Sequence, residues 1–255
     1  MKLKRILPYV HLISAMILAG SLPLAAEAAP TVVFDQGHGQ RFTISDPGEL
    51  QLSKLADTLR ASKITIAPVA TPLSDDTLKD AAGLVISGAF KPLQPEEVEA
   101  VARFVQNGGR LAIMLHIAPP LDSLLTRLDV DYSNSVLHER KNIIDKDLNF
   151  RVTDLSASPL FSGINSFSAY GVWALRPGAS SSAIARTSPE AWVDLKGENI
   201  LSEGDAVGAF AVVVMGDLGK GDFVVFGDDA IFQNRFLDDN NRKLAINLGT
   251  WLTRR

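Results

Sequence analysis

The sequence predicts an α/β fold, and three features of residues 82–115 lead to that prediction. Leu84–Ile86 and Leu111–Leu115 are short apolar runs with branched side chains, which is typical of buried strands. Between them, Pro95 begins a segment with valines at helical spacing, and Asn107–Gly109 can adopt the positive φ that ends a helix. A strand, a helix and a strand joined by short links indicate a right-handed parallel crossover. The sheet is therefore expected to be mostly parallel.

Four elements are predicted before this crossover. Strands are expected at Thr31–Phe34 and Ile64–Val69, which are short and rich in β-branched or aromatic residues. Gly48–Ser62 carries leucines at helical spacing and is predicted to form an amphipathic helix. Ser74 is placed to cap a short helix over Asp75–Asp80.

The elements predicted after the crossover end in a hairpin and a helix. Pro119 begins a helix that is expected to run to Asp131 with its leucines on one face. Ala209–Met215 and Asp222–Phe226 flank a glycine-containing turn and predict a β-hairpin. The last helix is expected over Asp239–Thr253.

Residues 132–208 follow a less regular pattern. Polar runs alternate there with short strand-like pieces, at Phe167–Leu175, Ala183–Thr187 and Ala191–Leu195. We interpret the segment as an insertion or β-rich extension that covers one edge of the sheet. It belongs to a single α/β domain of residues 29–255, because no linker-like stretch separates it from the rest.

The first 28 residues have the pattern of a secretory signal peptide. Three basic residues near the start precede a mostly apolar stretch, and the alanines at positions 26 and 28 fit a small-x-small cleavage site. We expect cleavage after Ala28. The protein is then periplasmic or secreted and meets the membrane only during export.

Charge and cysteine content exclude several classes of function. The predicted signal peptide carries three basic residues and one acidic residue, so its removal takes the net charge from −4 to −6. The remaining chain has no Lys/Arg cluster, and a nucleic-acid partner is therefore not expected. The sequence contains no cysteine, which excludes disulfides, a cysteine nucleophile and a thiolate metal site. An exported chain without cysteine suits the bacterial periplasm, where disulfides are permitted but not required.

Three segments carry a family resemblance. They are VVFDQGHGQRF at 32–42, the crossover from Val85 to Leu115, and GKGDFVVFGDDAIFQN at 219–234 with the helix that follows it. Together they resemble the class I glutamine-amidotransferase-like family. More narrowly they are similar to the GIFT group, which includes gliding-motility transporter auxiliary proteins, an intraflagellar transport protein and exported bacterial proteins of unknown function. The resemblance implies a flavodoxin-like three-layer sandwich with a mostly parallel sheet.

The chain departs from this family at its catalytic residue. True amidotransferases carry a nucleophilic cysteine on the turn after the strand that corresponds to Leu111–Leu115, and this chain has His116 there. A G-x-S-x-G nucleophile elbow is also absent from the sequence. The residue inventory therefore excludes cysteine-based glutaminase chemistry. The GIFT resemblance implies a binding or scaffolding module rather than an enzyme.

The residues that follow the predicted strands are the candidates for a binding site. Ligands of open parallel sheets lie beyond the carboxyl ends of the strands. An aspartate at such an end also commonly caps the next turn, which is its ordinary structural role. The candidate ligand-binding residues are Asp35, Gln36, Gly37, His38, Gly39, Ser87, Gly88, His116, Asp228 and Asp229.

These residues leave three kinds of chemistry open. Asp35, His38, His116 and Asp228 are candidate ligands of a divalent metal such as Zn²⁺, Mn²⁺ or Fe²⁺, although no H-E-x-x-H motif accompanies them. Backbone amides at Gly37 and its neighbours form a candidate anion cradle with Ser87-Gly88 opposite. Asp35 and His38 also suit an acid–base pair, but no nucleophile is evident beside them.

We expect a non-enzymatic exported module that uses no cofactor. It would bind a small ligand or an envelope protein, such as a transport or motility protein, at the carboxyl edge of the sheet. The alternative is a metal-assisted or acid–base hydrolase that uses Asp35, His38, His116 and Asp228.

Overall fold

The computed structural model describes residues 28–254, which form a mixed α/β fold around one large sheet. Residues 1–27 of the predicted signal peptide lie outside the described residues. The main sheet contains twelve strands within residues 28–254, and a separate pair of strands lies beside it. In this part of the chain, none of the helices combines the length and the apolar character that a membrane span requires.

Five neighbouring strands form the parallel half of the main sheet. Their spatial order is β2, β1, β3, β4 and β14, and every adjacent pair is parallel. Their bounds are Thr65–Val69, Thr31–Asp35, Gly83–Ser87, Arg110–Met114 and Gly221–Phe226. The predicted crossover is confirmed, because β3 and β4 are parallel and α3 (Pro95–Gln106) connects them. All five carboxyl ends consequently point to one edge, which we call the carboxyl edge.

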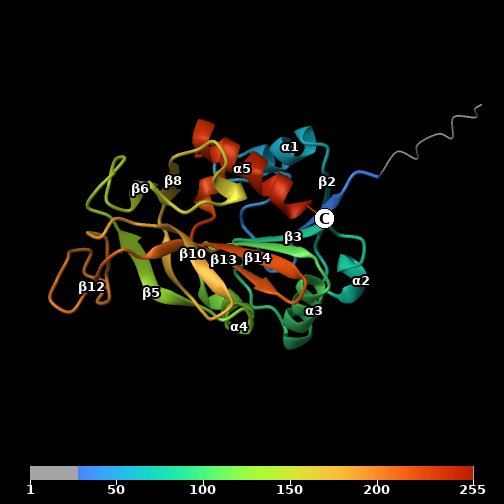
Figure 1. Ribbon diagram of the computed structural model, residues 1–255, viewed down its shortest axis with the longest axis horizontal. Helices are drawn as coiled ribbons and strands as arrows, with labels where there is room; N and C mark the ends of the chain where they lie inside the picture. The colour runs from blue at the N-terminus through green and yellow to red at the C-terminus, as the bar shows by residue number, and fades with distance from the viewer. Residues whose placement is uncertain (1–27, 255) are drawn as a thin grey trace, which may run out of the picture.

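Helices cover both faces of the parallel half (Figure 1). On one face lie α1 (Ser53–Ala61) and α5 (Asp239–Leu252), and on the other lie α2 (Asp75–Leu78), α3 and α4 (Asp122–Arg127). Successive residues of a strand point to opposite faces. In β3, Val85 therefore packs in the cluster beneath α1 and α5, whereas Leu84 and Ile86 pack in the cluster beneath α3 and α4.

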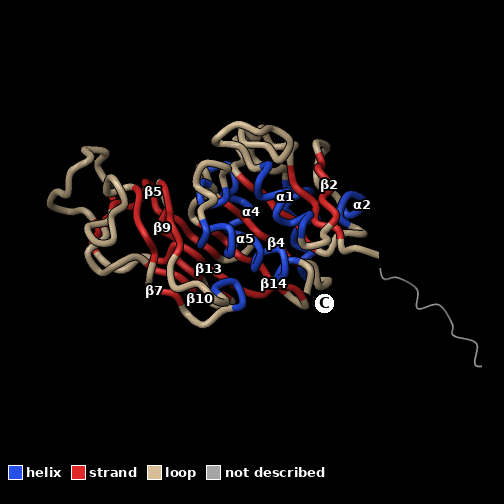
Figure 2. The backbone as a smooth tube through the Cα atoms, turned by 90° about the horizontal axis from the view of Figure 1, so that it is seen from above, coloured by secondary structure: helices blue, strands red, loops and turns tan. Residues whose placement is uncertain are grey.

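The second half of the sheet is antiparallel, so the sheet is mixed rather than mostly parallel. From β13 outward, the strands β9, β5, β11 and β12 each pair antiparallel with their neighbour, and β10 joins β13 to β7. Figure 2 shows β5 and β9 toward one end of the molecule, β2 toward the other and β13 between them. The bounds of these seven strands are Ala211–Leu218 (β13), Trp173–Pro177 (β9), Val130–His138 (β5), Trp192–Val193 (β11), Ala206–Val207 (β12), Ser181–Arg186 (β10) and Asp154–Leu155 (β7).

Two predicted elements are divided where the backbone adopts a positive φ. The helix predicted from Pro119 to Asp131 is a 3-10 turn followed by α4, and it ends before Asp129, whose φ of 55° begins the turn into β5. The strand predicted over Phe167–Leu175 is interrupted at Gly171, where φ is 88°. Its first part is β8 (Phe167–Tyr170), which pairs with β6 (Asn149–Val152), and its second part is β9 in the main sheet.

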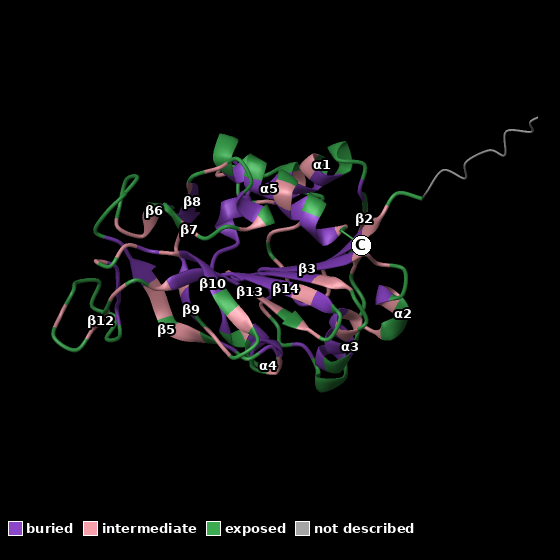
Figure 3. Ribbon diagram, viewed as in Figure 1, coloured by how far each residue is buried: buried purple, intermediate pink, exposed green. Residues whose placement is uncertain are grey.

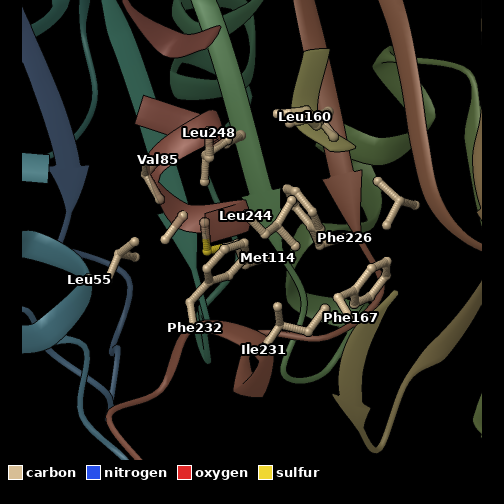
Figure 4. Close-up of a cluster of buried hydrophobic side chains, with 14 of the residues drawn as sticks. Leu55, Val85, Met114, Leu160, Phe167, Phe226, Ile231, Phe232, Leu244 and Leu248 are labelled. Carbon is tan, nitrogen blue, oxygen red and sulfur yellow. The ribbon is translucent and has the colours of Figure 1, made fainter. Parts of the chain in front are cut away.

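Helix α5 anchors one hydrophobic face. Leu244 and Leu248 are fully buried and lie against Val85, Met114 and Phe226 of the sheet (Figure 4). Buried residues concentrate in the central strands, whereas the outward surfaces of the helices are exposed (Figure 3). Because deleting a large buried side chain typically costs about 2–5 kcal/mol, this cluster is a main source of stability.

Asn241 of α5 is the polar exception in this face. Its side chain is fully buried; the carbonyl accepts from the Ser168 amide at 2.9 Å, and the amide group donates to the backbone oxygens of Ser168, Ile231 and Phe236 at 3.0–3.1 Å. The side chain therefore connects α5 to β8 and to the turn after β14.

Asn241→Leu is expected to destabilise the protein by about 2–4 kcal/mol, because it leaves these backbone groups buried without partners. The matched control is Asn240→Leu at the exposed neighbouring position, which should change stability by less than about 0.5 kcal/mol. Urea unfolding followed by circular dichroism measures both changes, and equal losses in the two variants would contradict the role given to Asn241.

Candidate functional site

The carboxyl edge holds all ten predicted site residues, but it divides them into two groups. The first group is Asp35, the last residue of β1, with Gln36, Gly37, His38 and Gly39 of the turn that follows. The others follow β3, β4 and β14 and gather around His116.

His38 lies between two carboxyl groups. Its Nδ1 atom is 2.9 and 2.8 Å from the two carboxyl oxygens of Asp35, and its Nε2 atom is 3.1 Å from Oε1 of Glu97. All three side chains are buried. Burial lowers the pKa of His38, but the hydrogen bonds and charges of Asp35 and Glu97 outweigh it, so the pKa is raised above 6.5. Both ring nitrogens are occupied, and His38 has none left for a substrate.

The same carboxyl groups use the nearby backbone amides. The Gly37 amide donates to Oδ1 of Asp35 at 3.0 Å, and the Gln40 side chain donates to Oδ2. On the other side, Glu97 accepts from the amides of Leu73 and Gln94, each at 2.8 Å. The Gly37 amide was predicted to help bind an external anion. In the structure it binds the carboxyl group of Asp35 instead.

His116 forms the second group with Asp229. Its Nδ1 atom is 3.1 Å from Oδ1 of Asp229, a residue with no exposed surface, whereas the His116 side chain is 37 % exposed. The imidazole ring also contacts Phe42 and Phe90, with ring centroids 4.8 and 5.3 Å apart. The hydrogen bond that the His116 ring donates to Asp229 is the main reason that the pKa of His116 is raised.

Asp228 has the capping role that aspartates at strand ends commonly have. One carboxyl oxygen accepts from the Ala230 amide at 2.8 Å and the other from the Tyr170 amide at 2.7 Å. Burial, followed by the charge of Asp229, raises the pKa of Asp228 to about 8. Its oxygens face the interior of the protein and connect the end of β14 to β8.

Two polar atoms in this region lack a hydrogen-bond partner among residues 28–254. They are Oγ of Ser87 and Oδ2 of Asp229, and both are buried. Gly88, whose φ is 56°, lies directly beside Asp229: a Cβ atom there would be 2.8 Å from that Oδ2 atom. Only glycine tolerates both this conformation and this approach.

The four proposed metal ligands do not form one cluster. Asp35 and His38 belong to the first group, and His116 and Asp228 to the second. Within residues 28–254, no three His, Cys, Asp or Glu side chains are placed to hold one ion.

A pocket of about 350 Å³ opens beside the first group. It is lined by Gly37, His38, Ala70, Pro72, Lys91, Pro92, Gln94 and Glu97. Ligand pockets commonly occupy about 300–1,000 Å³, so this one suits a small molecule. The imidazole of His38 and the carboxyl group of Glu97, which line the pocket, are already hydrogen-bonded to each other.

The sequence analysis missed several residues of this edge, namely Glu97, Arg41, Phe42, Phe90 and Lys91. Glu97 carried one detectable signal, because it lies in the first turn of a predicted helix near a histidine-containing turn. Its neighbour Glu96 carries the same signal and is exposed. Local sequence alone therefore does not separate the buried acid from the solvated one.

The comparison with known proteins identifies the family. A family model described as a domain of unknown function (DUF4350) matches residues 44–248. The chain belongs to the DUF4350 family. Among the curated proteins, none matches its sequence. The match includes β3, β4 and β14 together with His116 and Asp229, and it begins after the turn that carries His38.

Solved structures share the α/β fold of this DUF4350 protein. The mmIFT52 N-terminal domain superposes with a TM-score of 0.71 at 16% identity, over 88% of this chain and 98% of that domain. A putative ThuA-like protein from Bacteroides uniformis ATCC 8492 gives a TM-score of 0.55 at 13% identity, over 91% of this chain and 95% of that protein. A cytoplasmic protein from Salmonella typhimurium LT2 superposes with a TM-score of 0.57 at 15% identity, over 88% of this chain and 100% of that protein. At these identities the likeness concerns the fold.

Glu97→Gln is expected to lower the pKa of His38, because the charge and hydrogen bond of Glu97 both raise it. An NMR titration of the His38 ring protons measures the shift. Glu96→Gln removes the same charge from the exposed neighbouring position and should leave the His38 titration unchanged. Identical titrations in the two variants would contradict the contact between His38 and Glu97.

His38 should also make stability depend on pH. Its pKa is higher in the folded protein than the value of about 6.5 for an unfolded chain, so its contribution is complete below that value. The contribution is lost as the pH rises through the folded pKa. The free energy of unfolding lost in His38→Gln should therefore be larger at pH 6 than at pH 9 in urea denaturation. A loss that does not change with pH would contradict this linkage.

Proposed function

We propose that this protein is a non-enzymatic exported module that binds a small ligand at the carboxyl edge of its sheet. The pocket beside Gly37 and His38 is the observation that carries the proposal. It lies where open α/β sheets bind their ligands, and its volume suits a small molecule.

The pairing of the pocket's ionisable walls supports binding rather than catalysis. A general base needs a free lone pair within hydrogen-bond reach of the substrate. Both ring nitrogens of His38 are already engaged, and each carboxyl oxygen of Asp35 and Glu97 already accepts a hydrogen bond. Such a wall is rigid and pre-organised, which lowers the entropic cost of binding.

The alternative hydrolase would need Asp35, His38, His116 and Asp228 to act together. The separation of these residues into two groups makes that alternative the weaker proposal. In addition, Asp228 uses both oxygens to hold backbone amides.

The narrower family assignment belongs to the same proposal. Assignment to the GIFT group and description as a flavodoxin-like three-layer sandwich are supported by helices on both faces of the parallel half and by the likeness to the mmIFT52 domain. The GIFT resemblance also makes an envelope transport or motility protein the alternative occupant of the edge. The signal-peptide pattern supports location in the periplasm or outside the cell.

Filling the pocket should abolish ligand binding. In a thermal-shift screen of amino acids, monosaccharides and nucleosides, we expect at least one compound to raise the midpoint temperature of unfolding. Ala70→Trp, at an exposed residue of the pocket wall, should weaken the binding of that compound at least about tenfold, because the indole occupies the space of the ligand. Ala61→Trp, at an exposed alanine outside the pocket, is the matched control.

Three outcomes would contradict the proposal. Equal binding by both tryptophan variants would place the ligand elsewhere. Turnover in an esterase, phosphatase and glycosidase panel that is lost on His38→Gln would favour the hydrolase. Binding of no compound, together with an envelope protein cross-linked at Lys91, would replace the small ligand with a protein partner.

A further inference from the structure

The ring of Phe90 contacts two basic side chains at the carboxyl edge. The guanidinium carbon of Arg41 lies 4.5 Å from the centroid of this ring, and the His116 ring lies 5.3 Å from it. Phe42 adds a second aromatic surface beside His116. None of these four residues lines the 350 Å³ pocket, so they form a separate surface.

This surface carries a positive charge that its own neighbours do not neutralise. Arg41 is exposed and forms no ion pair within residues 28–254. His116 and Asp229 together are neutral, wherever the shared proton lies. Arg41 therefore adds a positive charge without an ion-pair partner among the described residues, on a chain whose overall charge is negative.

The contact with Asp229 also determines which nitrogen of His116 is available. Asp229 holds Nδ1, and Nε2 has no hydrogen-bond partner among the described residues. The charge of Arg41 lowers the pKa of His116, which shows that the two groups repel each other. An anion bound between them would remove that repulsion and accept a hydrogen bond from each.

We propose that Arg41 and His116 bind the carboxylate group of a ligand whose apolar or aromatic body lies on Phe42 and Phe90. A carboxylate matches the planar donor pair of a guanidinium and carries the single negative charge that balances the surface. The two phenyl rings offer edges and faces for stacking with an aromatic body. The site is independent of the pocket, and either one can be present without the other.

Benzoate is the probe that combines the two required features. Titration of the full chain at pH 7, followed through the ring signals of His116 by NMR, should give saturable shifts. Benzamide has nearly the same shape without the charge and should bind at least about tenfold more weakly, because it lacks the charge-assisted hydrogen bonds. Phenyl phosphate carries a larger negative charge than the surface balances and should bind no more tightly than benzoate.

Arg41→Gln tests the site without disturbing the core, because Arg41 is exposed. It should weaken benzoate binding about tenfold, the effect of losing one strong charge-assisted contact. Arg235→Gln is the matched control: Arg235 also lies over a phenyl ring, that of Phe236 at 5.7 Å, but it is part of a different surface. Its effect should be less than about twofold.

The opposite results would overturn the proposal. Equal losses in Arg41→Gln and Arg235→Gln would indicate a general charge effect. Equal binding of benzamide would show that the carboxylate is not recognised, and tighter binding of phenyl phosphate would assign the surface to a phosphate ligand. The pocket variant Ala70→Trp should bind benzoate normally, so failure of the pocket and failure of this site are distinguishable.

Discussion

The contact of His38 with two buried carboxyl groups is the interaction on which the carboxyl edge depends. An unpaired buried charge costs several kcal/mol, so such a cluster is stable only if each oxygen has a donor. Here each oxygen has at least one, from the His38 ring, from the Gln40 side chain or from the amides of residues 37, 73 and 94. These donors belong to three separate segments of the chain. The cluster therefore holds the turn after β1, the approach to α2 and the start of α3 together.

This internal pairing decides what remains available to a ligand. Amides of a glycine-rich turn usually attract an anion, but Asp35 already occupies the Gly37 amide. In our proposals, recognition uses exposed side chains around this turn, such as Lys91 at the pocket and Arg41 beside Phe90. On the other side of the edge, Asp229 similarly fixes His116. Each of the two histidines at this edge is oriented by a buried acid, and of these two only His116 keeps a ring nitrogen without a hydrogen-bond partner and an exposed surface.

Local patterns predict the parallel half of the fold well and the antiparallel half poorly, for a physical reason. The crossover through α3 is encoded by apolar spacing and by residues that begin and end a helix. By contrast, the start of β5 at Val130 was predicted to lie inside a helix, because leucines up to Leu128 continue the helical pattern until Asp129 turns the chain. The role of Glu97 depends on His38, which lies 59 residues away in the sequence. Local sequence patterns span far fewer residues, so they do not reveal this contact. Long-range pairing of this kind determines both the mixed sheet and the candidate site.

The turn after β4 carries an aromatic and basic side chain, His116. A nucleophile on this turn must be exposed, and a base must be close enough to take its proton. In this chain the turn carries His116, whose backbone oxygen accepts from the Trp173 indole at 3.1 Å and whose ring packs against Phe42 and Phe90. These contacts make the turn part of an aromatic and basic surface. Since fold and function are separable, the arrangement of these side chains, rather than the α/β scaffold, is the basis for proposing that this edge binds a ligand.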